Sequence, residues 1–213
     1  MRPRCAGEPQ YRDATGAWDV KTKDYGMSDT GMDLIGSGMV AITRDALAGL
    51  RSALMRDTGY AAAGYLQEAG YAGGGALFEA FRGWLAARGA SEPESLSVGT
   101  FQSHATDFFR ECGWGSLVVG ELHETVATLD SADWGEATPG AGLEHPGCHL
   151  SSGMFADFFG RLANAPLAVM EVECRSAGAE RCRFLLGSTD VLQQVYDGMS
   201  AGAGYEEAVG SAA

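Results

Sequence analysis

Three of the five cysteines of this 213-residue chain lie between positions 148 and 184, and that stretch constrains the fold more than any other. It reads CHLSSGMFADFFGRLANAPLAVMEVECRSAGAERCRF. A helix-like segment follows Cys148, a β-rich run ends at Cys174, and a second short strand carries Cys182. Thiolates and carboxylates are ligands that zinc accepts in proteins. Three thiols with the carboxylate Glu171 among them therefore indicate a metal site.

Composition and charge narrow the class of protein. Hydrophobic residues make up 46% of the chain and charged residues 20%, which is typical of a globular protein. The net charge of −13 argues against nucleic acid and against an anionic membrane surface as partners. No apolar run approaches the roughly 20 residues of a membrane-spanning helix.

The first residues, MRPRCAGEPQYRDATG, lack the apolar core of a signal peptide. We therefore expect a cytoplasmic protein. Cysteines stay reduced in that compartment, which favours metal ligation over disulfide bonds.

The periodicity of apolar residues predicts helices that come before and after an antiparallel sheet, with one more helix inserted into it. Such an order is typical of an α+β domain and not of a doubly wound α/β fold. Residues 1–40 are expected to form a loosely ordered extension, 41–200 the domain, 130–147 a surface loop within it, and 201–213 a flexible tail. Helices are expected over residues 44–57, 60–88, 97–112, 149–162 and 189–199, and strands over 116–122, 125–129, 167–174 and 181–186.

The second predicted helix is unusually rich in glycine. Each glycine weakens a helix by about 1 kcal/mol relative to alanine, so the residues need a reason to be there. Two reasons fit: close packing against another helix, which we favour, or space for a bulky flat ligand. The glycines are Gly64, Gly70, Gly73, Gly74 and Gly75.

The chain resembles the V4R (4-vinyl reductase) domain family, which is related to the Bet3-like and haem–nitric-oxide-sensor folds. The resemblance covers roughly residues 43–190 and is most specific in the late block. The residues that carry it are Gly59, Gly70, Gly74, Gly113 and Gly115, then Cys148-His149, Gly153, Glu171-x-x-Cys174, Gly178 and Cys182-Arg183-Phe184.

This resemblance implies a zinc ion held by Cys148, Glu171, Cys174 and Cys182, because the aromatic-sensing members of the family use Cys, Glu, Cys and Cys at the same intervals. Four protein ligands leave no open position, so the zinc is expected to stabilise the fold and not to catalyse. Two alternatives stay open. The cysteines could be buried free thiols, and Glu173 could replace Glu171, since residues two apart face the same side of a regular strand.

The resemblance also implies a function. Single-domain members act in bacteriochlorophyll synthesis, and the family name implies reduction of the 8-vinyl group of a chlorophyllide. Reduction needs a hydride donor. The sequence has no dinucleotide fingerprint, because the glycines at 36–38 lack its other elements, and it has no redox-active Cys-x-x-Cys pair. We therefore favour a carrier or accessory factor that binds a tetrapyrrole, with pigment-synthesis enzymes as partners.

Three points stay open at this stage. The first alternative is an aromatic-ligand sensor that acts on a separate regulatory partner. The second is a genuine 8-vinyl reductase with an external electron donor, so enzymatic activity is undecided. The choice between a monomer and a homodimer is also undecided.

Candidate ligand-binding residues combine aromatic rings with polar groups. In the sensors of the family a His and a Trp hold the effector, and the Trp position falls near Thr128. His123 and His149 could also bind a ligand or the magnesium of a tetrapyrrole. The alternative for the aromatic residues is that they form plain core. The candidates are His104, Phe108, Trp114, Thr128, Phe155 and Phe158.

Overall fold

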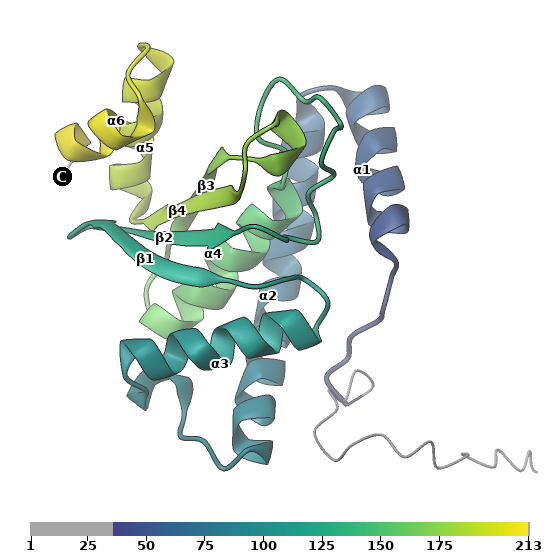
Figure 1. Ribbon diagram of the computed structural model, residues 1–213, viewed down its shortest axis with the longest axis vertical. Coiled ribbons are helices and arrows are strands. Elements are labelled where there is room, and N and C mark those ends of the chain that lie inside the picture. Colours follow the sequence, from purple (N-terminus) through teal and green to yellow (C-terminus); the bar gives the residue numbers. More distant parts are fainter. Residues whose placement is uncertain (1–35, 213) are drawn as a thin grey trace, which may run out of the picture. The chain divides into compact units, whose positions relative to one another are not determined.

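Four strands of six residues each form one antiparallel sheet in the computed structural model, which describes residues 36–212. The strand order is β1-β2-β4-β3, so β1 and β3 are the edges (Figure 1). The prediction of an α+β fold with an antiparallel sheet packed against helices is confirmed. The strands are β1 Val118–His123, β2 Val126–Ser131, β3 Ala168–Glu173 and β4 Cys182–Gly187.

The predicted helices are present, and several begin where the sequence places a capping residue. The hydroxyl oxygens of Thr43, Ser97 and Ser188 each accept a backbone N–H from the first turn of the helix that follows. No helix within residues 36–212 is both long and apolar enough to cross a membrane. The helices are α1 Arg44–Thr58, α2 Ala61–Ala87, α3 Val98–Glu111, α4 His149–Ala163, α5 Thr189–Ser200 and α6 Tyr205–Ala212, with short 3₁₀ turns η1 Pro93–Ser95 and η2 Arg175–Ala177.

The sheet separates two apolar cores, because neighbouring residues of a strand point to opposite faces. Leu129 and Phe184 face a large core built with α2, α3 and α4. Val126 and Leu185 face a smaller core with α5 and α6. The two faces of the sheet thus contribute side chains to separate cores.

Helices α2 and α4 approach closely enough for backbone to touch backbone. A methyl group on Gly153 would lie 1.9 Å from the Gln67 carbonyl oxygen, and one on Gly70 would lie 1.9 Å from the Leu150 carbonyl oxygen. A methyl group on Gly74 would meet the Asp157 side chain at 2.7 Å. Close helix packing, and not space for a ligand, is therefore the reason for Gly70 and Gly74 in α2 and for Gly153 in α4, whereas nothing lies within 4 Å of a methyl group on Gly64 or Gly73.

Two expectations about loops and ends are wrong. The segment 130–147 is not only a surface loop, because Trp134 and Glu136 in it are 1% and 2% exposed. The flexible tail expected from residue 201 instead contains α6, which buries Ala208 and Val209 in the smaller core. Most of the predicted extension, residues 1–35, lies outside the described residues.

The close approach of α2 and α4 makes a direct prediction. Gly153→Ala should lower the free energy of unfolding by about 1–3 kcal/mol, because the new methyl group has to push two backbones apart. Gly73→Ala is the matched control in α2, where nothing lies within 4 Å of the added atom. It should raise that free energy by about 1 kcal/mol through helix propensity alone. Urea unfolding midpoints measure both, and equal midpoints would contradict the packing argument.

Candidate metal centre and cavity

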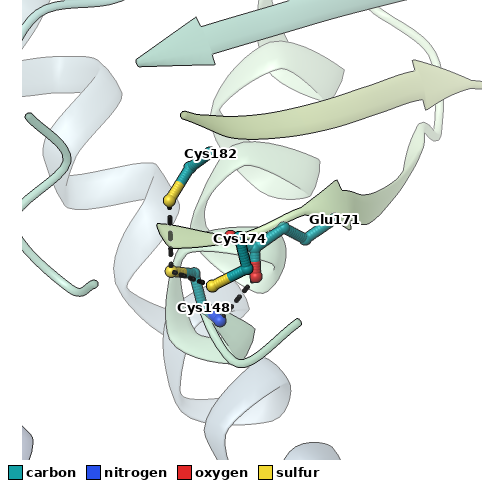
Figure 2. A group of neighbouring side chains, drawn as sticks. All are labelled: Cys148, Glu171, Cys174 and Cys182. Atoms are coloured by element: carbon teal, nitrogen blue, oxygen red, sulfur yellow. Dashed lines mark hydrogen bonds between the residues drawn. The ribbon is translucent and has the colours of Figure 1, made fainter. Parts of the chain in front are cut away.

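Four side chains from three places in the chain converge at one end of the sheet (Figure 2). Cys148 is the residue immediately before α4, Glu171 lies within β3, Cys174 follows β3, and Cys182 begins β4. The three cysteines are 0–1% exposed. The strands and the start of α4 thus hold together the groups that the sequence predicts as ligands.

The distances in the cluster suit a tetrahedral metal ion. Cys148 Sγ lies 3.8 Å from Cys174 Sγ and 3.9 Å from Cys182 Sγ. One ligand atom from each of the four residues lies within 4.8 Å of all the others. With zinc–sulfur bonds of about 2.3 Å, the corners of a tetrahedron are about 3.8 Å apart. A disulfide would need sulfurs about 2.05 Å apart, so the thiols are not bonded to one another. The cluster is therefore consistent with a metal site.

A bulge in β3 decides which carboxylate joins the cluster. Glu171 is opposite Phe184 and Glu173 is opposite Arg183, with the register shifted between them. Because of the extra residue, the two carboxylates face opposite sides of the sheet. Glu173 accepts hydrogen bonds from Arg181 (2.9 Å) and from the Tyr205 hydroxyl (2.6 Å). The expectation that both carboxylates face the same side is wrong, and only Glu171 is near the thiols.

The electrostatics of the cluster favour a bound cation. The Cys148 N–H donates to Glu171 Oε2 at 2.7 Å, while Oε1 is buried without a partner. Burial raises the pKa of Glu171 to about 8. The Cys174 and Cys182 thiols, through hydrogen bonds, raise the pKa of Cys148. Four acidic groups so close cannot all lose their protons without a positive charge between them. A dication would supply that charge and a partner for Oε1.

The start of α4 is held by a buried carboxylate that sequence patterns do not reveal. Glu136 accepts the N–H groups of Leu150 (3.1 Å) and Ser151 (2.8 Å), which are free donors at a helix start. The Ser151 hydroxyl also donates to Glu136 and accepts from the Trp134 indole N–H at 2.7 Å. Arg51 donates to the Glu136 carbonyl oxygen at 2.6 Å. The partners of Glu136 are 14, 15 and 85 positions away from it, so no local motif could have indicated the site.

The predicted ligand-binding residues do not gather around one cavity. Phe108, Phe155 and Phe158 are fully buried in the larger core, as the plain-core alternative supposes. Trp114 stacks on Trp134, which is also in that core, with ring centres 5.5 Å apart.

The two remaining candidates are His104 and Thr128. His104 packs edge-on against Trp84, with ring centres 5.9 Å apart. Thr128 is opposite Leu185 and therefore lies on the face of the sheet covered by α5 and α6. Five of the six candidates thus lie in or against the larger core, and Thr128 lies on the opposite face of the sheet.

A cavity of about 720 Å³ lies against β1, β2 and the end of β4, away from the cysteine cluster. His123 lines it, and its Nδ1 is buried without a hydrogen-bond partner. Among buried side-chain nitrogens and oxygens of residues 36–212, only this atom and Glu171 Oε1 lack a partner. The apolar part of the lining is Leu96, Val98, Phe101, Val119, Val126, Leu129, Phe159, Leu162, Leu167 and Leu186, with smaller residues between them.

The first prediction for the cluster concerns metal content. Cys174→Ser should lose the metal, about one ion per chain, and several kcal/mol of the free energy of unfolding, because metal binding is coupled to folding. Cys112→Ser is the control, since Cys112 lies outside the cluster. Elemental analysis and thermal unfolding of both variants provide the measurement. A Cys174→Ser variant that kept its metal would contradict the assignment of this ligand.

The second prediction concerns pH. In the metal-free protein the pKa of Glu171 is raised from 4.5 to about 8, so its burial costs more stability as pH rises through that range. The metal needs deprotonated ligands, so its affinity increases over the same range. The difference in melting temperature between metal-loaded and metal-free protein should therefore widen from about pH 5 to about pH 8. Scanning calorimetry measures it, and a constant difference would argue against a carboxylate ligand.

Two solved structures of known proteins resemble this chain. The phenol-responsive sensory domain of the transcription activator PoxR, solved with phenol, has a TM-score of 0.54 and 18% identity, over 78% of this chain and 83% of that one. A vinyl-4-reductase family protein from Methanocaldococcus jannaschii has a TM-score of 0.36 and 18% identity, over 54% of this chain and 68% of that one. No curated protein sequence matches the chain. The first likeness shows a shared fold.

A protein-family model matches the segment of the chain that contains the cysteine cluster. Glu136, the α4 helix, strands β3 and β4 and all four clustered side chains lie within the matched segment. Residues 136–188 match the family model described as the V4R domain.

Proposed function

We propose that this chain binds an apolar small molecule in the cavity against β1 and β2, and that the cysteine cluster holds a structural zinc ion. The observation that carries the proposal is a mainly apolar cavity whose lining includes His123, a residue with a buried and unpartnered ring nitrogen, Nδ1. An unpaired buried polar atom costs about 1–3 kcal/mol, so such atoms are rare unless something binds them.

The ligand class we favour is a tetrapyrrole intermediate of (bacterio)chlorophyll synthesis, with the chain as its carrier or accessory factor. The cavity volume of about 720 Å³ falls within the range of about 300–1,000 Å³ found for small-molecule sites and is far larger than a phenol molecule. An imidazole nitrogen is also a common ligand for a metal ion. His123 is thus suited to bind the magnesium of such a ring.

Zinc is the metal we favour, in a structural role separate from the ligand. Three thiolates and one carboxylate are a ligand set that zinc accepts, and four protein ligands leave no place for a substrate. None of the four residues lines the cavity: Cys182 begins β4, whereas Leu186 and Gly187 at its other end line it. The metal would stabilise the strands that form the cavity without touching its contents.

A second candidate function is an aromatic-ligand sensor acting on a separate regulatory partner. The fold shared with the phenol-responsive sensory domain of PoxR favours this alternative. The third candidate, an 8-vinyl reductase with an external electron donor, follows from the family name alone. Turnover of a divinyl chlorophyllide by the purified chain with NADPH would decide for the reductase.

Binding can be tested by titration with a magnesium porphyrin methyl ester while the Soret band is followed. Val119→Trp should abolish the spectral shift, because Val119 lines the cavity and a tryptophan there fills it. Val118→Trp is the matched control, since Val118 is the preceding residue of β1, is exposed, and does not line the cavity. It should leave the shift unchanged.

The outcomes separate the candidates. A porphyrin shift lost only in Val119→Trp supports the carrier. Binding of phenols without binding of porphyrin supports the sensor. If neither kind of probe binds to the metal-loaded protein, the cavity is not a ligand site and the proposal fails.

A further inference from the structure

Three glutamates are among the residues that line the cavity, and they come from three different places in the fold. Glu94 lies in η1, Glu121 lies in β1, and Glu124 lies in the turn between β1 and β2. All three are exposed, so they stand where the cavity opens to solvent. No arginine or lysine is among the residues that line it. The polar part of the cavity therefore carries charge of one sign.

These carboxylates are not neutralised within the described part of the chain. None of the three takes part in an ion pair or a side-chain hydrogen bond within residues 36–212. Arg82 attracts Glu94 without forming an ion pair with it, because its guanidinium is paired with Glu92 at 2.9 Å and with Glu79 at 3.6 Å. The carboxylates thus remain available to a ligand.

On the basis of the proposed function, we propose that the cavity selects its ligand by charge. Among apolar molecules it prefers one whose polar end is cationic, such as an amine, or neutral, over one whose polar end is anionic, because that end lies among Glu94, Glu121 and Glu124. A single exposed ion pair contributes little to affinity. When the opening of an apolar cavity carries charges of one sign only, their electrostatic potentials add. The cavity then discriminates between a cationic and an anionic ligand.

Charge selection also restricts the proposed tetrapyrrole. Free carboxylates on the ring would meet the three glutamates at the mouth. A tetrapyrrole would therefore bind as an ester, or with its carboxylate side chains directed away from the protein. This restriction concerns the polar end alone and leaves the His123 contact unchanged.

The test uses three probes with one ring system and different charge: 2-naphthylmethylamine, 2-naphthylmethanol and 2-naphthoate. Dissociation constants are measured by calorimetry on the full metal-loaded chain, at low and at high salt. The amine should bind about tenfold more tightly than the carboxylate, with the alcohol between them. High salt should reduce this spread, because it screens exposed charges.

Two triple variants with the same change in net charge separate a local effect from a general one. Glu94→Gln with Glu121→Gln and Glu124→Gln should bring the three dissociation constants together and leave that of the alcohol nearly unchanged. The control changes Glu144, Glu180 and Glu207 to Gln, which are exposed and do not line the cavity. It should keep the order of the three probes.

The failure of the inference differs from the failure of the proposed function. If the alcohol binds but all three probes bind equally, or the carboxylate binds best, the charge selection is overturned. If the control variant removes the order as fully as the cavity variant does, the selection comes from the net charge of the chain and the inference also falls. If none of the three naphthyl probes binds while the magnesium porphyrin does, the charge selection is overturned and the proposed function stands. If the porphyrin and phenols also fail to bind, both proposals are overturned.

Discussion

The contact of α2 with α4 through glycine is the constraint on which the rest of the described structure depends. Gly153 lies against the Gln67 carbonyl and Gly70 against that of Leu150, so α4 has one position along α2. From that position α4 contributes to the candidate metal centre, to the larger core and to the cavity. Cys148 stands just before its first residue, Phe155 and Phe158 fill the larger core from its middle, and its last turn lines the cavity. A single helix packing therefore aligns the candidate metal centre with the candidate ligand site.

The two buried atoms without partners, at opposite ends of β4, have the same physical origin. Proteins bury polar groups at a cost unless a hydrogen bond or an ion compensates for it. At one end the uncompensated atom is Glu171 Oε1, beside three thiols in tetrahedral spacing. At the other it is His123 Nδ1, beside apolar side chains and a cavity. The first environment suits a small dication and the second a larger apolar molecule.

Local signals in the sequence were sufficient to predict most of the helices and strands and the clustered thiols. They were insufficient wherever the position of a side chain depends on residues that are distant in the sequence. Thr43, Ser97 and Ser188 mark helix starts because their hydroxyls act within one turn. The buried carboxylate of Glu136 accepts N–H groups 14 and 15 positions away, and its carbonyl oxygen accepts from Arg51, 85 positions away. The side of the sheet on which Thr128 lies depends on the strand register. Whether the aromatic side chains pack in the core or line a cavity depends on which helices pack against one another. The α6 helix was missed because its two buried residues are small and stand in an Ala- and Gly-rich segment.

The bulge in β3 has a consequence for how replaceable the clustered carboxylate is. In a regular strand, residues two apart are near-equivalents, and a loss at one can be compensated by the other. The shifted register commits Glu173 to Arg181 and Tyr205 on the opposite face, where it ties the strand to α6. The chain therefore has two glutamates within three residues but no spare ligand. Because of one extra residue in the strand, two glutamates that look interchangeable in the sequence have different roles.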